Sequence, residues 1–270
     1  MPEAQRTVDS DGVELAVSVD GEGPAVVLLH GLTATHRYVV MGSKALPRAG
    51  FQTVAYDARG HGASSPAPGY SYAALADDLG AVLDALGLDR AVLAGASMGA
   101  HTLLRFALDH PERAAGLVVI TPAFEPDGER DFDRWDALSD GLRSGGVEGF
   151  VAAYGEPDVP QQWRETVLRV IRQRLAAHEH PEALADALRV VPRSSPFASL
   201  ADLGALDVPT VVVADRDEAD PGHPLAVGEA YAAAIPGAEL VVEEPGQSPI
   251  AWQGGQLSKV IAGLAARAAG

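Results

Sequence analysis

The sequence predicts an α/β protein built on a doubly wound, mostly parallel sheet of about eight strands. Short β-rich runs alternate with longer segments rich in Ala and Leu, and three of the runs are apolar without interruption. The alternation is typical of right-handed strand–helix–strand units, and continuous apolar runs are typical of strands buried on both faces. With 270 residues, of which 47% are hydrophobic, the chain can bury one substantial core.

The expected elements cover most of the chain. Strands are predicted over residues 13–19, 25–29, 51–57, 90–95, 117–121, 208–214 and 239–243. Helices are predicted over residues 71–86, 98–108, 225–235 and 256–268. The first of these helices shows the pattern most clearly, because its apolar residues recur at helical spacing and form one stripe: Leu75, Leu79, Val82, Leu83 and Leu86.

One stretch, residues 122–206, interrupts the alternation. No strand is expected there, and helices are predicted over residues 132–143, 147–154, 161–177 and 181–191. Strands resume after it with the same composition, which favours a helical insertion over a separate helical domain. The expected organisation is one core, residues 1–121 and 207–270, that carries the insertion.

Composition excludes several classes of function. The chain has 20 Lys and Arg against 37 Asp and Glu, and the net charge of −17 would repel nucleic acid and anionic membranes. The absence of cysteine excludes disulfides, thiol nucleophiles and cysteine-bound metal. Without a membrane-spanning run or a secretory signal, a cytoplasmic protein is expected. A small-molecule substrate is the expected partner, with neither cofactor nor metal, and the oligomeric state is left open.

The motif that carries chemistry is Gly-Ala-Ser-Met-Gly at residues 95–99, a G-x-S-x-G run. It lies between a predicted strand and a predicted helix, the setting in which this motif forms a sharp turn with a strained central residue. Such a turn presents the Ser97 hydroxyl above the carboxyl ends of the strands, where open α/β sheets bind ligands. This context disfavours the alternative, a glycine-rich turn with an incidental serine.

Four sequence blocks give the chain a resemblance to the α/β-hydrolase superfamily over nearly its whole length. In order, they are His30-Gly31-Leu32 after an apolar strand, residues 57–64 (Asp-Ala-Arg-Gly-His-Gly-Ala-Ser), the turn at Ser97, and residues 208–214 followed by Asp217 and Pro221. The resemblance implies the eight-stranded hydrolase fold. It also implies that the insertion is the family's cap, inserted between the sixth and seventh strands.

The same resemblance implies roles for individual residues. Ser97 matches the nucleophile. The backbone N–H groups of Leu32 and Met98 match the oxyanion hole, where each donor is worth about 3 kcal/mol. Asp217 matches the acid of the triad, with a solvated loop carboxylate as the alternative. If the alignment is shifted slightly, a neighbouring residue, Asp215 or Glu218, takes the position of the acid instead.

The resemblance makes two conspicuous histidines structural. His30 and His61 are expected to tie the oxyanion loop to the turn at residues 57–64 by hydrogen bonds. His110 stands at a helix end, where a cation suits the helix dipole, and is also expected to be structural. His178 and His180 lie in a polar stretch of the insertion and are expected to be exposed.

The pattern breaks at the general base. The family's histidine follows the last strand in a Gly-His-Ser-Pro-like setting, whereas residues 246–249 of this chain read Gly-Gln-Ser-Pro. A glutamine amide cannot accept the proton of the serine. Gln247 is therefore expected either to bridge Ser97 and Asp217 by hydrogen bonds or to turn to solvent. In the second case, a histidine elsewhere in the chain acts as the general base.

Three histidines could replace the missing base. His223 is preferred, because Gly222 and Pro224 can bend its loop over the site; the others are His36, after the oxyanion loop, and His101, one helical turn after Ser97. The leading function is a hydrolase that acts through Ser97 on an ester, lactone or similar small, largely apolar carbonyl compound. The rival is a non-hydrolytic protein of the same fold, either lyase-like or a catalytically silent binding protein.

Overall fold

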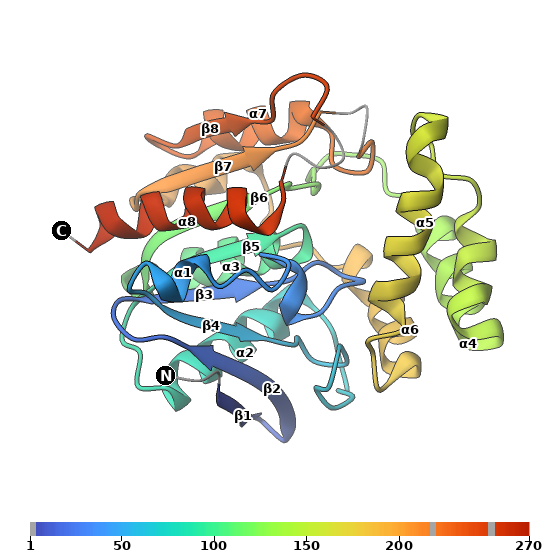
Figure 1. Cartoon of the computed structure of the whole chain (residues 1–270), viewed down its shortest axis with the longest axis horizontal. Helices are drawn as coiled ribbons and strands as arrows, with labels where there is room; N and C mark the ends of the chain where they lie inside the picture. Colours follow the sequence, from blue (N-terminus) through green and yellow to red (C-terminus); the bar gives the residue numbers. More distant parts are fainter. Residues whose placement is uncertain (1–3, 217–219, 248–251, 270) are drawn as a thin grey trace.

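The structure is a computed structural model that describes residues 4–216, 220–247 and 252–269. Its centre is one eight-stranded sheet in the order β1-β2-β4-β3-β5-β6-β7-β8 (Figure 1). The pairs β1–β2 and β2–β4 are antiparallel and all others are parallel, which confirms the predicted sheet. The strands are β1 (Ala4–Ser10), β2 (Val13–Asp20), β3 (Ala25–Leu29), β4 (Gln52–Tyr56), β5 (Ala91–Ala96), β6 (Ala114–Ile120), β7 (Thr210–Ala214) and β8 (Glu239–Val242).

Helices cover both faces of this sheet, as Figure 1 shows. One face carries α2 (Tyr72–Ala85), α3 (Met98–Asp109) and α7 (Leu225–Ala234), and the other carries α1 (Ala45–Arg48) and α8 (Gly254–Ala268). The four predicted core helices are thereby confirmed within a few residues. The short 3₁₀ helices of the described structure are η1 (His36–Tyr38), η2 (Pro111–Arg113), η3 (Val191–Arg193) and η4 (Leu200–Ala205).

The central strands are apolar on both faces. In β5, Leu93 belongs to the buried cluster beneath α2 and α3, whereas its neighbours Val92 and Ala94 belong to the cluster beneath α8. Only a continuous apolar run can supply both clusters, which explains the pattern seen in the sequence. Because β3 to β8 run parallel, the loops after these strands meet at one edge of the sheet, where ligands bind in such folds.

The strand that the sequence did not reveal is β1. Most of its side chains are exposed and only Val8 and Ser10 are buried, so it has no apolar pattern to detect. The available signal was the turn that follows it. Asp11 and Gly12 both have positive φ (50° and 83°), and an Asp-Gly pair is typical of a two-residue β-hairpin.

Between β6 and β7 lies the helical insertion, residues 122–206, which contains α4 (Phe132–Tyr154), α5 (Gln161–Leu175) and α6 (Pro181–Val190). Gly146 (φ 59°, ψ −146°) breaks α4, so the two helices predicted in this stretch are both present. Figure 1 shows the insertion beyond the edge at which the parallel strands end.

The insertion is attached to this edge by a buried apolar cluster. Leu32 and Met98, from the loops after β3 and β5, pack with Leu184 and Leu188 of α6. Full burial of such a side chain contributes about 1.5–3 kcal/mol, so the cluster holds the insertion against these loops. Within the described ranges, no helix has the length and apolar character needed to cross a membrane.

Candidate active site

The turn between β5 and α3 holds Ser97 in a strained conformation. Ser97 has φ 50° and ψ −112°, a backbone geometry that non-glycine residues rarely adopt. The flanking glycines are required by close contact: a Cβ on Gly95 would lie 2.4 Å from the Gly99 backbone, and one on Gly99 would lie 2.2 Å from the Leu29 carbonyl oxygen. This sharp strand-to-helix turn is the geometry that the G-x-S-x-G motif predicted.

The loop after β3 lies directly beside this turn. A Cβ placed on Gly31 would be 3.6 Å from the Cβ of Ser97, so the next peptide, which carries the N–H of Leu32, is close to the serine. The N–H groups of Leu32 and Met98 donate to no other described residue. Both N–H groups are thus available to an acceptor beside the serine turn, and their role as an oxyanion hole stays a prediction.

His30 and His61 hold the loop that carries Leu32. The Ala58 N–H donates to His30 Nε2 (2.9 Å), so His30 carries its proton on Nδ1 and donates to the Gly31 carbonyl oxygen (2.8 Å). The ring nitrogens of His61 lie 2.7 Å from the Leu32 carbonyl oxygen and 2.9 Å from that of Arg59. Burial lowers the pKa of His30 to about 3 and also lowers that of His61. The expected structural ties are confirmed.

His178 differs from the expectation that it is exposed. Only 9% of this residue is accessible, and it joins the insertion to the core. The Gly62 N–H donates to His178 Nδ1 (2.9 Å), while His178 Nε2 lies 3.3 Å from the Thr33 carbonyl oxygen. Burial lowers the pKa of His178 to about 4. The prediction was wrong because the polar neighbours of His178 in sequence gave no sign of these distant backbone partners.

His101 is buried below Ser97 and its ring is occupied. The N–H groups of Ala123 and Phe124 donate to its Nε2 (3.1 and 3.2 Å), and its Nδ1 lies 3.1 Å from the Tyr72 hydroxyl oxygen. Burial lowers the pKa of His101 to about 3. A base needs a free lone pair, so this geometry argues against His101 as the acceptor of the serine proton.

His36 pairs with the buried carboxylate of Asp57. Its Nδ1 lies 2.9 Å from Asp57 Oδ1, which also accepts the His36 backbone N–H (2.7 Å). Although burial favours the neutral acid, the hydrogen bonds and charges of His36 and His30 lower the pKa of Asp57 to about 2. Asp57 Oδ2 accepts the Ala63 N–H (3.0 Å), so this carboxylate joins the loop after β3 to the turn at residues 57–64.

The loop after β7 contains the second histidine–aspartate pair. His223 Nδ1 lies 2.7 Å from Asp220 Oδ2, and His223 Nε2 has no hydrogen-bond partner in the described part of the chain. Burial disfavours a charged His223, but the Asp220 carboxylate outweighs burial and raises the pKa of His223. His223 is also near enough to His101 for its charge to lower the pKa of His101, which places the pair on the side of the sheet that holds α3.

Asp220 was not among the sequence candidates. A carboxylate three residues before a histidine was the available signal, but the spacing alone does not show which aspartate in this acidic stretch the ring will contact. The nearby carboxyl of Asp215 is half-buried, and its Oδ1 has no partner. Burial, followed by repulsion from Asp220 and Glu243, raises the pKa of Asp215 to about 7.

Two other sequence candidates, Asp217 and Gln247, gain no support as site residues from the described part of the chain. Asp217, with Glu218 beside it, lies outside the described residues, so its predicted role as the acid stays a prediction. Gln247 follows β8 in a turn, where its N–H donates to the Glu244 carbonyl oxygen (3.2 Å), and its side chain is exposed. No hydrogen bond joins the Gln247 amide to Ser97.

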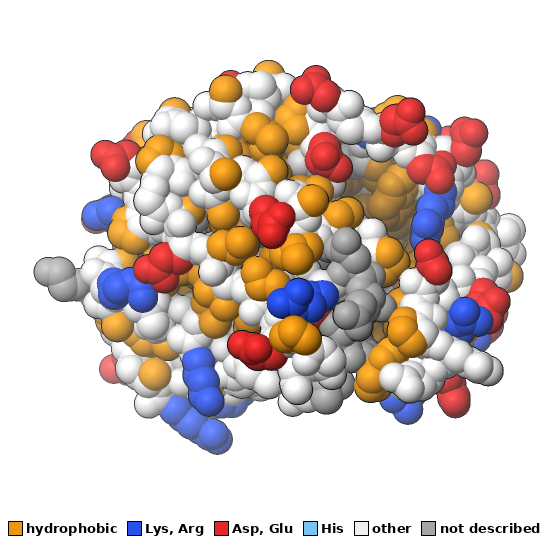
Figure 2. All heavy atoms as spheres, turned by 90° about the horizontal axis from the view of Figure 1, so that it is seen from above, with side chains coloured by type: hydrophobic (Ala, Val, Ile, Leu, Met, Phe, Trp, Pro, Cys, Tyr) orange, Lys and Arg blue, Asp and Glu red, His pale blue; other side chains and the backbone are white. Residues whose placement is uncertain are grey.

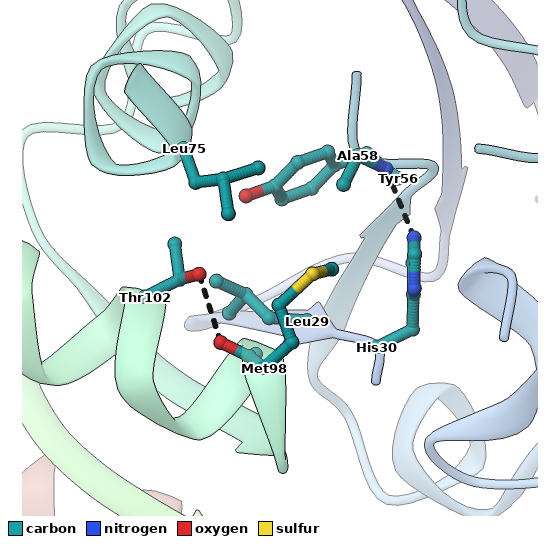
Figure 3. A pocket seen from close by; sticks show the side chains of 8 residues that line it. Leu29, His30, Tyr56, Ala58, Leu75, Met98 and Thr102 are labelled. Carbon is teal, nitrogen blue, oxygen red and sulfur yellow. Dashed lines mark hydrogen bonds between the residues drawn. The ribbon is translucent and has the colours of Figure 1, made fainter. Parts of the chain in front are cut away.

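The structure has a small cavity beside the serine turn and a hollow in the surface near the insertion. Figure 3 shows a cavity behind the turn, lined by residues that include His30, Tyr56, Met98 and Thr102. Its volume of about 10 Å³ is room for one water molecule and not for a substrate. Figure 2 shows a larger hollow on the side of the insertion, whose visible wall consists of hydrophobic side chains.

Metal chemistry finds no support in the described part of the chain. No group of three or more His, Asp or Glu residues there is arranged to hold a metal ion. The candidate reactive groups that the structure describes are Ser97, the two backbone donors and the pair of His223 with Asp220.

The doubly wound sheet, with a sharp strand-to-helix turn after β5, is the architecture of the α/β-hydrolase fold. A model of the alpha/beta hydrolase fold family matches residues 24–177, and the chain belongs to this family. The non-heme chloroperoxidase CPO-A1 of Kitasatospora aureofaciens is 30% identical over 267 residues, covering 92% of this chain and 94% of the relative.

Solved structures show the same likeness. A thermophilic esterase from Thermogutta terrifontis matches with a TM-score of 0.80 and 27% identity over 99% of both chains. Est816, described as an N-acyl homoserine lactone degrading enzyme, matches with a TM-score of 0.70 and 30% identity over 88% of this chain and 91% of its own. Relatives with different named activities share this fold, so the choice of substrate must rest on the site itself.

Proposed function

We propose that the protein is a serine hydrolase of an ester, lactone or related small carbonyl compound, and that His223, held by Asp220, is its general base. The observation that carries the proposal is the strained Ser97 beside the unused N–H groups of Leu32 and Met98. Strain at one residue persists only where the surrounding structure imposes it, and such residues cluster at functional sites. The esterase and the lactone-degrading relative support the substrate class.

In the proposed reaction, the Ser97 oxygen attacks the substrate carbonyl carbon while its proton passes to His223 Nε2. The negative charge that develops on the carbonyl oxygen is stabilised by the N–H groups of Leu32 and Met98. His223 then gives its proton to the leaving oxygen as the carbon–oxygen bond breaks. Water hydrolyses the acyl-enzyme in a second step of the same kind, and the helical insertion acts as the cap that shields it.

His223 is the histidine best suited to this role. The ring of His101 is occupied by backbone N–H groups, and those of His30 and His61 hold the oxyanion loop. His223 has a free Nε2, a carboxylate on Nδ1 and a raised pKa, which are the properties of a general base near neutral pH. In this arrangement, Asp220 performs the role that the sequence assigned to Asp217.

The test is labelling and turnover at Ser97. We expect a fluorophosphonate probe to label the wild type, and we expect para-nitrophenyl acetate hydrolysis to fall by about 10³-fold or more in Ser97→Ala. Thr102→Ser, which removes a buried methyl group from the same helix and keeps the hydroxyl, is the control. An unlabelled wild type with no ester turnover would contradict the proposal.

The exposed position of Gln247 favours a second candidate function, that of a catalytically silent binding protein of this fold. The residue that replaces the usual base offers no proton acceptor, and this function requires none. It predicts that Ser97→Ala changes neither ligand binding nor any measurable ester turnover.

A further inference from the structure

Arg174, near the end of α5, is a half-buried cation without a counter-ion contact. Its guanidinium forms no ion pair or hydrogen bond with any described residue, and its Nε is buried without a partner. The Arg174 guanidinium lies over the ring of Tyr38, whose centroid is 5.4 Å from the Arg174 Cζ. A buried polar group without a partner costs free energy unless something else in the functional state supplies the missing contact.

Other arginines of the insertion are arranged differently. Those that form ion pairs with carboxylates are Arg143, Arg164, Arg172, Arg189 and Arg193. Arg172, on the same helix, makes two hydrogen bonds to Glu148 and faces solvent. Arg174 differs from these five arginines, because its guanidinium has neither an ion pair nor a hydrogen bond to a described residue. Its guanidinium is therefore free to bind a partner from outside the chain.

Arg174 lies where the insertion meets the loops of the proposed site. Tyr38 follows the oxyanion loop, Tyr154 ends α4, and Asp220 belongs to the loop after β7; all three act on the pKa of Arg174. Burial outweighs their combined effect and lowers that pKa. The one carboxylate among them, Asp220, is hydrogen-bonded to His223 and makes no hydrogen bond or ion pair with Arg174.

We propose that Arg174 binds a carboxylate of the substrate, separate from the carbonyl group that Ser97 attacks. The planar guanidinium matches a carboxylate geometrically, and a substrate carboxylate would supply the hydrogen-bonded ion pair that Arg174 lacks. The net charge of −17 repels anions at long range, so recognition must come from contacts within the cleft. The identity of the reacting group rests on the proposed function, but the carboxylate site itself does not.

The first experiment compares two esters of similar acyl length, para-nitrophenyl hemisuccinate and para-nitrophenyl butyrate. They differ at the far end of the acyl chain, which is a carboxylate in one and a methyl group in the other. We expect Arg174→Gln to lower the ratio of their kcat/KM values by about 10- to 100-fold, since a hydrogen bond to a charged group is lost. The readout is a ratio, so a general loss of folding or activity does not mimic the effect.

Two variants sharpen this measurement. Arg174→Lys keeps the charge but loses the planar fork, and it should retain part of the preference for hemisuccinate. Arg172→Gln removes an exposed arginine from the same helix and should leave the ratio unchanged. An unchanged ratio in Arg174→Gln, or an equal fall in Arg172→Gln, would overturn the proposed carboxylate recognition for these esters.

The second experiment does not need turnover. Benzoate and its neutral analogue benzamide are titrated into Ser97→Ala, with and without Arg174→Gln, and binding is measured by calorimetry. We expect benzoate to bind more tightly than benzamide by about tenfold, and we expect the preference to vanish with Arg174→Gln. Equal binding of the two probes to Ser97→Ala would overturn the site, whereas a benzoate preference in a protein without ester turnover would uphold it and refute the hydrolase function alone.

Discussion

His36 and His223 make the same contact in two regions of the molecule, the loop after β3 and the loop after β7. Each directs Nδ1 at an aspartate oxygen, 2.9 Å away at Asp57 and 2.7 Å away at Asp220, and each has 23% of its side chain exposed. The aspartates differ, because Asp57 is 2% exposed and Asp220 is 39% exposed. Asp57 is part of the buried framework, whereas Asp220 lies near the protein surface.

The two rings also face different surroundings. His36 lines a pocket of about 100 Å³ with Leu28 and Thr53, and none of the residues around Ser97 contributes to it. His223 is close enough to His101 of α3 and to Arg174 of α5 for their charges to interact. A histidine–aspartate pair is thus no active site by itself, and what its free ring nitrogen faces decides its role.

The largest expected difference between the pairs is in catalysis. His223→Ala should lower kcat/KM for para-nitrophenyl acetate by about 10²–10⁴-fold, because the serine loses its proton acceptor. His36→Ala should lower it far less. Steady-state kinetics of both variants checks the assignment, and the reverse order of the two effects would transfer the role of base to His36.

Stability should respond in the opposite order. His36→Ala removes the hydrogen bond to the buried Asp57 carboxylate and should reduce the free energy of unfolding by about 1.5–3 kcal/mol. His223→Ala removes a bond to a carboxylate that is 39% exposed and should reduce it by less than about 1 kcal/mol. Urea denaturation of the two variants measures this difference, and equal losses would mean that both pairs are structural.

The pH profile should move when Asp220 is neutralised. The base acts in its neutral form, so activity rises with pH through the pKa of His223, which Asp220 raises above the ordinary histidine value. Asp220→Asn removes the stabilisation of the charged ring, and the rising limb of kcat/KM should shift to lower pH. Asp57→Asn serves as the comparison, since it should not shift this limb. A limb that stays in place in Asp220→Asn would exclude this pair from the rate-limiting proton transfer.

The smallest effect is expected at Gln247. Its side chain is exposed, and the proposed base is His223, so Gln247→His should change ester turnover little. The measurement is kcat for para-nitrophenyl acetate across neutral pH. A gain of orders of magnitude would instead show that the wild type lacks a working base and that the usual position of this family can be restored.

Several local features of the fold, namely buried strands, an amphipathic helix and the turn at Ser97, could be predicted from the sequence. Continuous apolar runs mark β5, β6 and β7 because a strand buried on both faces needs them, and helical spacing marks α2 because one stripe must face the sheet. The strained turn at Ser97 was also predictable. A side chain at Gly95 or Gly99 would clash with the backbone of adjacent elements, so the glycines are required there. The five-residue motif is therefore enough to predict the turn.

Contacts between distant segments were decided by the tertiary structure alone. His178 binds Gly62, 116 residues away in sequence, and so became a buried link where exposure was expected. The unpaired state of Arg174 likewise depends on which carboxylates the fold brings near α5. Spacing in the sequence reports how residues share one helix or strand. The partner of a polar side chain from a distant segment depends on how whole helices and strands pack, and no local sequence pattern predicts this packing.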